Sequence, residues 1–295
     1  MTGRGAVRMG LLALLWGSCF LWIDLALTGL SPAQITVARS ALGAAVLLVL
    51  ARASGQRLPR GLWGRLLVAA FFCNTLPFLL FAVGQQTVDS GVAGVLNATT
   101  PLFSLLIGLG LGTDRGLTPA RVTGLVLGFA GVLLIFAPWR HGVSGVGALA
   151  LLGAAVSYAV AFAYMGRRLV GHGGPLAVSA AQLTAATGLS ALLLPFDHAP
   201  TTPNATAIAA VVVLGVFGTG ATFVLNYRII ADEGPTSAAT VGYLLPVVSV
   251  ALGALVLDEP LTVRVVAGMA VVLVGVALTR SPTPARTAGE PAGRR

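Results

Sequence analysis

The chain has 295 residues, of which 56% are hydrophobic and 9% are charged, and its mean hydropathy is +0.92. A soluble domain carries roughly 25% charged residues, so this composition excludes a soluble globular protein. The net charge of +9 does not indicate nucleic-acid binding, because the arginines that supply it are spread over short gaps between apolar runs and form no single basic patch.

Apolar runs of about 20 residues, the length needed to cross about 30 Å of hydrocarbon, recur along the whole chain. Each membrane span must satisfy its backbone hydrogen bonds internally, so the runs predict helices, whereas a closed barrel would show alternating segments of about ten residues. The predicted fold class is therefore all-α, a polytopic membrane protein with ten transmembrane helices. The predicted spans are residues 9–28, 33–51, 63–83, 91–112, 118–137, 144–165, 176–195, 205–229, 235–257 and 261–279.

Arginines alternate between the gaps that separate these spans. With the N-terminus inside, every arginine except Arg39, Arg140 and Arg264 falls in an inner gap or in a tail. The positive-inside rule then predicts that both termini are cytoplasmic. We expect a short cytoplasmic N-terminus at residues 1–8. The tail at residues 281–295 has no apolar content with which to fold, so we expect it to be disordered.

The fifth and tenth spans lie within a repeated sequence. Residues 114–134 return 144 positions later as residues 258–278, and the matched residues of the first copy are Asp114, Leu117, Thr118, Val122, Gly124, Gly131, Val132 and Leu134. Each copy follows a span that contains a proline, Pro101 in the first half and Pro246 in the second. Two consecutive units of five spans enter the membrane in opposite directions, as in transporters that work by alternating access. The predicted units are residues 9–137 and 144–280.

Single residues along the spans form a characteristic pattern of order and spacing. They are Trp16, Gly17, Ser18, Pro32, Arg39, Asn97, Pro101, Gly124, Gly131, Tyr158, Ala159, Gly234, Pro246, Asp258, Glu259 and Gly268. In this order they resemble the EamA-type, ten-span members of the drug/metabolite transporter superfamily, over about residues 9–280. The first copy departs from the family pattern, with Asp114-Arg115 where a glutamate is usual. The resemblance implies two inverted five-helix EamA-like repeats and transport of small organic molecules, most often export, but it does not supply the substrate.

Asp24 and Arg39 are the ionisable residues that lie well inside predicted spans. Asp24 is about four residues from the outer end of the first span and Arg39 about six residues into the second, which at about 1.5 Å per residue gives them a similar depth. Buried charges in membranes are costly and tend to pair or to line a watery path. A structural Asp24–Arg39 ion pair is therefore the first interpretation, and an outer-gate or proton-coupling role for Asp24 is the alternative.

Two amides lie beside prolines in otherwise apolar spans. Asn74 comes three residues before Pro77, and Asn97 comes four residues before Pro101. A proline frees a backbone carbonyl one turn earlier in its helix, and an amide that faced lipid would leave its own polar groups unsatisfied. Both amides should therefore face inward, either to bind substrate or to form hydrogen bonds between helices. Gln182 is a further amide of this kind.

Aromatic residues complete the candidate site. Trp16 and Tyr158 lie deep in their spans, and Tyr243 comes three residues before Pro246, which we expect to break its helix. We expect Trp16, Asn74, Asn97, Tyr158 and Tyr243 to line one central cavity that binds substrate. Core packing of the aromatic rings is the alternative.

The remaining motifs narrow the function. His141, His172 and His198 lie in separate gaps and cannot share a metal site or a catalytic triad, and no phosphate-binding loop is present. We therefore expect no enzyme activity, no metal and no cofactor. Glycine stripes in the fifth and tenth spans allow close helix packing, either within the chain or in a homodimer.

The predicted function is a secondary transporter in the cytoplasmic membrane, with lipid around it and a small-molecule substrate. It would move an amino acid or a drug-like amphipathic molecule, most often outward. A polytopic membrane enzyme and a passive channel subunit are the alternatives.

Overall fold

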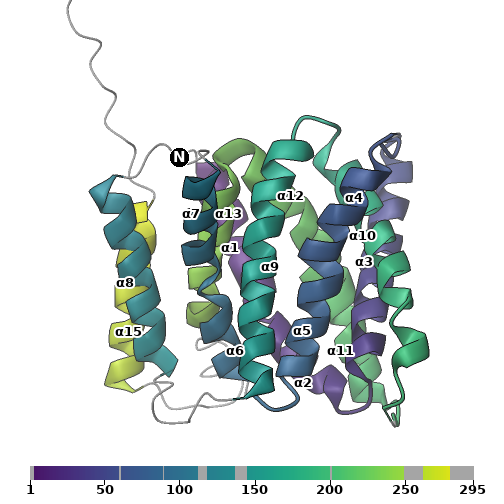
Figure 1. Ribbon diagram of the computed structural model, residues 1–295, viewed down its shortest axis with the longest axis horizontal. Helices are drawn as coiled ribbons and strands as arrows, with labels where there is room; N and C mark the ends of the chain where they lie inside the picture. The colour runs from purple at the N-terminus through teal and green to yellow at the C-terminus, as the bar shows by residue number, and fades with distance from the viewer. Residues whose placement is uncertain are drawn as a thin grey trace, which may run out of the picture.

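The computed structural model describes residues 3–59, 61–88, 90–111, 118–136, 145–199, 201–248 and 262–279. All regular structure within these ranges is helical, which confirms the all-α fold class (Figure 1). The α-helices are α1 (Gly3–Gly17), α2 (Cys19–Leu27), α3 (Pro32–Ala53), α4 (Trp63–Ala70), α5 (Leu76–Gly84), α6 (Ser90–Asn97), α7 (Thr100–Gly110), α8 (Pro119–Phe136), α9 (Val146–Arg168), α10 (Pro175–Ala191), α11 (Ala205–Gly215), α12 (Thr222–Glu233), α13 (Pro235–Thr240) and α15 (Val263–Thr279). Short π or 3-10 segments are η1 (Phe71–Thr75), η3 (Leu194–Phe196), η4 (Val216–Ala221) and η5 (Val241–Tyr243).

Six helical stretches are long and apolar enough to cross a membrane, so the chain is a multi-pass membrane protein. They are Val7–Leu27, Pro32–Ala53, Trp63–Gly84, Val146–Arg168, Pro175–Phe196 and Ala205–Glu233. These stretches correspond to the first, second, third, sixth, seventh and eighth predicted spans. Three of the other predicted spans contain shorter apolar helices, Thr100–Gly110, Val122–Leu134 and Val263–Gly275. The ninth continues beyond the described residues.

A π-helical turn, η1, interrupts the third span directly before Pro77. Proline has no N–H, and its ring clashes with the carbonyl four residues earlier, which disfavours a regular α-turn. The Leu76 amide instead donates to the carbonyl of Phe71, five residues back. Ser157 of α9 donates to the freed carbonyl of Phe72 at 2.7 Å. The helix break that Pro77 predicts is therefore a widened turn, and a neighbouring helix satisfies its backbone.

The second half of the chain carries irregularities at matching positions. The π turn η4 begins at Val216, which is 145 positions after Phe71, where η1 begins. In the fourth span the helix breaks after Asn97, between α6 and α7, and the 3-10 turn η5 begins 144 positions later at Val241. The spacing equals that of the sequence repeat to within one residue. The two halves therefore share their helix breaks as well as their sequence motif.

α8 and α15 lie side by side at one edge of the molecule (Figure 1). Their glycines bring the backbones together, since a Cβ on Gly275 would lie 2.5 Å from the backbone nitrogen of Gly128. A Cβ on Gly131 would lie 2.7 Å from the nitrogen of Val272. The glycine stripes are thus used for packing inside the chain. Formation of a homodimer stays a prediction.

The first helices of the two halves run in opposite directions. Arg8 in α1 forms an ion pair with Asp232 at the end of α12, at 2.5 Å. The next helix, α13, begins at Pro235, and a Cβ on Gly166 near the end of α9 would lie 3.3 Å from that proline's ring. The start of α1 therefore lies at the same end of the molecule as the end of α9.

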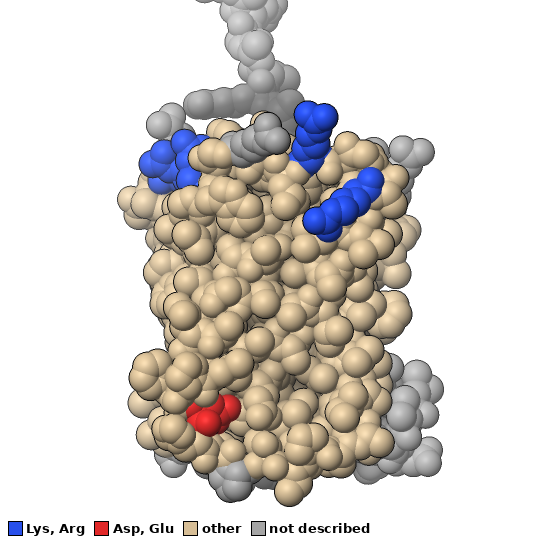
Figure 2. All heavy atoms as spheres, turned by 90° about the vertical axis from the view of Figure 1, so that its right-hand side faces the viewer, with Lys and Arg blue, Asp and Glu red and all other residues tan. Residues whose placement is uncertain are grey.

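Arginines gather at this end of the molecule. Figure 2 shows them in blue at the top of one face, while the acidic residue in view lies near the bottom. Arg65 lies within 3.4 Å of the carbonyl of Arg168 and 3.2 Å from His172, and Arg167 donates to the carbonyl of Leu111 at 2.8 Å. The described structure therefore has one strongly basic end. Several residues of the sequence analysis lie outside the described residues. They are Arg140, His141, Asp114 and Asp258 at the start of the two repeat copies, and the tail at residues 281–295 that is predicted to be disordered.

Candidate functional site

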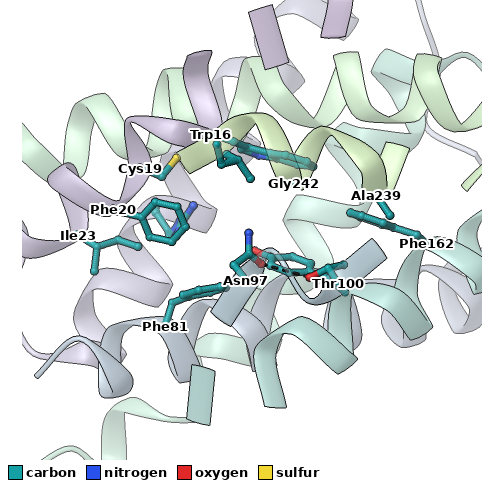
Figure 3. A pocket seen from close by; sticks show the side chains of 13 residues that line it. Trp16, Cys19, Phe20, Ile23, Phe81, Asn97, Thr100, Phe162, Ala239 and Gly242 are labelled. Carbon is teal, nitrogen blue, oxygen red and sulfur yellow. Dashed lines mark hydrogen bonds between the residues drawn. The ribbon is translucent and has the colours of Figure 1, made fainter. Parts of the chain in front are cut away.

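A cavity lies in the interior where helices of both halves meet (Figure 3). The cavity has a volume of about 50 Å³, and one buried water molecule requires about 10–15 Å³. The cavity as it stands therefore holds a few water molecules, and a larger solute would need its walls to move. It is lined by Trp16, Cys19, Phe20, Ile23, Arg39, Phe81, Asn97, Thr100, Tyr158, Phe162, Ala239, Gly242 and Leu245.

The broken helices of the two halves each form part of the wall. Asn97 and Thr100 flank the break between α6 and α7, and Gly242 lies in η5 at the corresponding position of the second half. The Thr100 hydroxyl donates to the Asn97 side-chain oxygen at 3.3 Å. In Figure 3 the Asn97 amide nitrogen points into the open space. Each half thus contributes an irregular segment to the wall at the corresponding position. In a regular helix the backbone polar groups of this segment would bond to each other and would not be available to a ligand.

Aromatic rings from both halves form a continuous apolar surface on the cavity. Trp16 stacks on Phe162 with ring centroids 6.3 Å apart and an interplanar angle of 7°, and Phe162 stacks on Tyr158 at 5.9 Å and 25°. Tyr158 contacts Phe81 at 6.0 Å, and Phe81 meets Phe20 edge-on at 5.7 Å. Such a surface suits an apolar or aromatic group of a ligand, because ring pairs and flat apolar surfaces pack closely.

Arg39 is the basic residue among those described in the cavity wall, and only 4% of it is exposed. Its Nε donates to the Thr219 hydroxyl at 3.1 Å, and its guanidinium carbon lies 3.6 Å from the ring centre of Phe78. Glycines let α3 approach the backbone before η4 closely enough for Arg39 to reach Thr219. A Cβ on Gly215 would lie 3.2 Å from the Arg39 carbonyl. A Cβ on Gly43 would lie 3.1 Å from the Gly215 carbonyl. α3 therefore rests almost directly on the backbone that leads into η4, which carries Thr219.

The predicted Asp24–Arg39 ion pair is not formed. Asp24 is exposed and lines a separate polar hollow at the other end of the molecule from the arginines, together with Gln85, Gln86 and Thr201. The interpretation relied on equal depth, but depth along two helices does not fix the direction in which each side chain points. Among the described residues the ion pair that forms is instead Arg8–Asp232. The outer-gate alternative for Asp24 stays a prediction.

The structure brings three of the five predicted substrate-binding residues to one cavity, namely Trp16, Asn97 and Tyr158. Asn74 lies outside it and is buried in a contact between helices. Its side-chain oxygen accepts a hydrogen bond from Gln182 at 2.7 Å, and the Tyr227 hydroxyl donates to Gln182 in turn. Asn74 therefore follows the alternative interpretation, in which the amide bonds one helix to another.

Tyr243 also lies outside the cavity, although Gly242 beside it faces in. Its hydroxyl donates to the Leu125 carbonyl at 3.0 Å, and its ring lies so close to Gly128 that a Cβ there would be 2.8 Å away. Tyr243 therefore fastens α8 to the broken ninth span. Pro101 is at the start of α7, and Pro246 is helical and buried.

Several lining residues were not predicted from the sequence. Phe162 follows Tyr158 by one turn on the same face of α9, so the sequence contains a signal for it. Thr100 follows Asn97 by three residues, but the break between α6 and α7 separates them. Phe81 offered no such signal, because the π turn before Pro77 changes the face that its helix presents. Among the described residues, no group of three or more His, Cys, Asp or Glu side chains could hold a metal ion.

Comparison with known proteins gives a consistent picture. The profile of the EamA-like transporter family matches the chain twice, at residues 4–137 and 145–281. An "Uncharacterized transporter" of Archaeoglobus fulgidus is 26% identical over 92% of this chain and 96% of its own length. A "Probable terminal-alkyne amino-acid exporter" of Streptantibioticus cattleyicolor is 26% identical over 92% of this chain and 91% of its own. A protein crystal structure with 21% identity has the same fold, with a TM-score of 0.78 over 95% of this chain and 97% of the other.

Proposed function

This chain belongs to the EamA-like transporter family, and we propose that it is a secondary transporter that moves a small organic molecule by alternating access. The observation that carries the proposal is the cavity between the two halves, with a broken helix of each half in its wall. Binding sites at the interface of two repeats, formed by discontinuous helices, are typical of secondary transporters. Rocking of one half against the other would expose such a site first to one side and then to the other.

Ten spans in two inverted repeats are the architecture we propose for this mechanism. The opposite directions of α1 and α9, the two π turns and the two matched helix breaks all support it. A two-fold axis in the membrane plane gives the protein two states of nearly equal energy, since each half can take the conformation of the other. Alternating access needs such a pair of states.

The small size of the cavity fits a closed intermediate in this cycle. The cavity of about 50 Å³ holds a few water molecules, which is too little room for a solute the size of an amino acid. Loading would therefore require the broken helices to move apart on one side. Helix breaks are the places where such motion disrupts the fewest backbone hydrogen bonds, because those bonds are already absent there.

We propose that the basic end of the molecule is cytoplasmic, so that both termini are inside. The supporting argument is the gathering of Arg65, Arg167 and Arg168 at one end, since the positive-inside rule retains arginine on the cytoplasmic side. Outward transport is the proposed direction. It is supported by the family resemblance and by the name of the Streptantibioticus relative, a probable exporter of terminal-alkyne amino acids.

Flux through proteoliposomes tests this function. We expect at least one compound of a panel of amino acids and amphipathic acids to cross faster than in protein-free vesicles, with a rate that saturates with concentration. Asn97→Ala should weaken substrate binding by about 1–2 kcal/mol, the value of a hydrogen bond to the ligand, or about 5- to 30-fold. Leu106→Ala is the matched control, because Leu106 is 63% exposed on α7, outside the cavity. A flux that rises linearly without saturation would identify a channel instead.

A further inference from the structure

Arg39 is a buried cation whose charge is not balanced by any carboxylate among the described residues. An unpaired charge inside a membrane protein is costly, and such residues mark sites of function. Of the five N–H donors of a guanidinium, Arg39 uses Nε–H for Thr219. The Cys19 thiol and the Tyr158 hydroxyl are also polar neighbours of Arg39, and neither of them supplies a full negative charge. The two terminal nitrogens therefore keep donors for a ligand.

We propose that Arg39 binds the carboxylate of the transported molecule, which identifies the substrate class as small monocarboxylates with an apolar body. This inference rests on the proposed transport function, because it concerns the same cavity. A guanidinium presents paired N–H groups in a plane that matches the two oxygens of a carboxylate. The Thr219 bond and the Phe78 ring hold the guanidinium in one orientation, so little side-chain entropy is lost when the carboxylate arrives.

The charge of the cavity selects a monoanion. Among the described residues of the lining, Arg39 is basic and none is acidic. One positive charge neutralises one carboxylate, whereas a phosphate or a dicarboxylate would bring a second charge into a low-dielectric site without a partner. A ligand ammonium group would find no carboxylate as counter-charge among these described lining residues. The proposal therefore requires the carboxylate of a substrate and not its amino group.

The rest of the cavity fits the apolar body. The stacked rings of Trp16, Phe162 and Tyr158 provide a flat apolar wall. Asn97 directs its amide nitrogen into the same space, where it can donate a second hydrogen bond to the ligand (Figure 3). A carboxylate on Arg39 would leave its chain to lie along these rings.

Matched acids and amides test the proposal directly. We choose 3-phenylpropanoate, 4-phenylbutanoate and 4-methylpentanoate, each with its primary amide, because the two members of a pair have nearly the same size and differ in charge. The readout is thermal stabilisation of the purified full-length protein in detergent, titrated to give an affinity. We expect at least one acid to stabilise the wild type and to bind at least about ten-fold more tightly than its amide, the lower end of the range for a charged hydrogen bond.

Variants of the cavity assign the effect to Arg39. Arg39→Gln should remove the preference for the acid, and Arg39→Lys should retain part of it, since lysine keeps the charge without the paired geometry. Arg228→Gln is the matched control, because it removes the same charge from an exposed arginine outside the cavity. If Arg39→Gln fails to fold, Thr219→Val provides the second test. It removes the hydroxyl that orients the guanidinium and should weaken acid binding several-fold while leaving amide binding unchanged.

Three results would overturn the proposal. They are equal binding of acids and amides, unchanged acid binding in Arg39→Gln, and no binding of any acid in the panel. Flux measurements separate this failure from a failure of the transport function. If the amides show saturable flux, and Arg39→Gln does not change that flux, the transport function would stand and the carboxylate site would be rejected. Arginine-dependent binding of an acid without saturable flux of any compound would keep the carboxylate site and reject transport.

Discussion

At the residue scale, Arg39 differs most from its sequence-based interpretation. Similar depth in adjacent spans favoured a salt bridge with Asp24, and such a pair would make both residues structural. In the structure the guanidinium contacts a hydroxyl and an aromatic ring, and Asp24 is exposed elsewhere. A hydroxyl and a ring compensate only part of the cost of burying a full charge. Arg39 is thus expected to lower the stability of the empty protein.

This expectation makes the first prediction. Arg39→Met removes the charge and keeps a long, unbranched side chain. We therefore expect the free energy of unfolding to stay equal or to rise by about 1–3 kcal/mol, as when a buried ion pair is replaced by well-packed apolar residues. Thermal unfolding of the purified protein in detergent, without added ligand, measures the change. Asp24→Asn should leave the unfolding temperature unchanged. A marked loss of stability in Arg39→Met alone would mean that the arginine is a structural residue.

At the element scale, glycine contacts and helix breaks determine how the helices pack. α8 and α15 approach each other through Gly128, Gly131 and Gly275, and Tyr243 joins α8 to the broken ninth span. Without a hydrophobic driving force between helices in lipid, this kind of backbone contact supplies much of the attraction. The pair α8–α15 therefore depends on small residues more than on large ones.

A glycine substitution provides the second prediction. In Gly275→Val the new Cβ would lie 2.5 Å from the Gly128 nitrogen, so the two helices must separate and lose their contact. We expect a loss of several kcal/mol of stability or a failure to yield monodisperse protein. Gly188→Ala in α10 is the control, because nothing lies within 4 Å of a Cβ there. Because alanine has a higher helix propensity than glycine, Gly188→Ala should leave the stability of the protein unchanged or raise it by up to about 1 kcal/mol. Equal behaviour of the two variants would contradict the packing role of Gly275.

The sequence predicted the elements better than it predicted their irregularities. Hydropathy locates the spans because lipid imposes length and apolarity on each, and the repeat reveals two similar halves. Pro77 indicates the first π turn, since its missing N–H has a known effect on the backbone. The second π turn, η4, contains no proline, so no residue in its sequence predicts it. The contacts of Arg39, Asn74 and Tyr243 depend on how each helix is rotated about its axis, which these irregular turns alter.

At the scale of the whole molecule, the two halves and the basic end predict an orientation in the membrane. Ser54 is exposed at the end of α3, beside the arginine-rich gap, and Thr202 is exposed near Asp24 at the opposite end. In whole cells, an impermeant thiol reagent should label Thr202→Cys and should reach Ser54→Cys only after the membrane is opened. Replacing Cys19 and Cys73 by serine removes the native thiols. The reverse pattern would invert the proposed topology.

The most direct test of the account uses one position in the cavity, Asn97. In the background without native cysteines, Asn97→Cys places a thiol at the break between α6 and α7, where the substrate site is proposed. An impermeant thiol reagent is added to right-side-out vesicles and, separately, to inside-out vesicles. If the cavity opens to each side in turn, the reagent will label position 97 in both preparations. Labelling from one side only, or from neither, would contradict alternating access at this site.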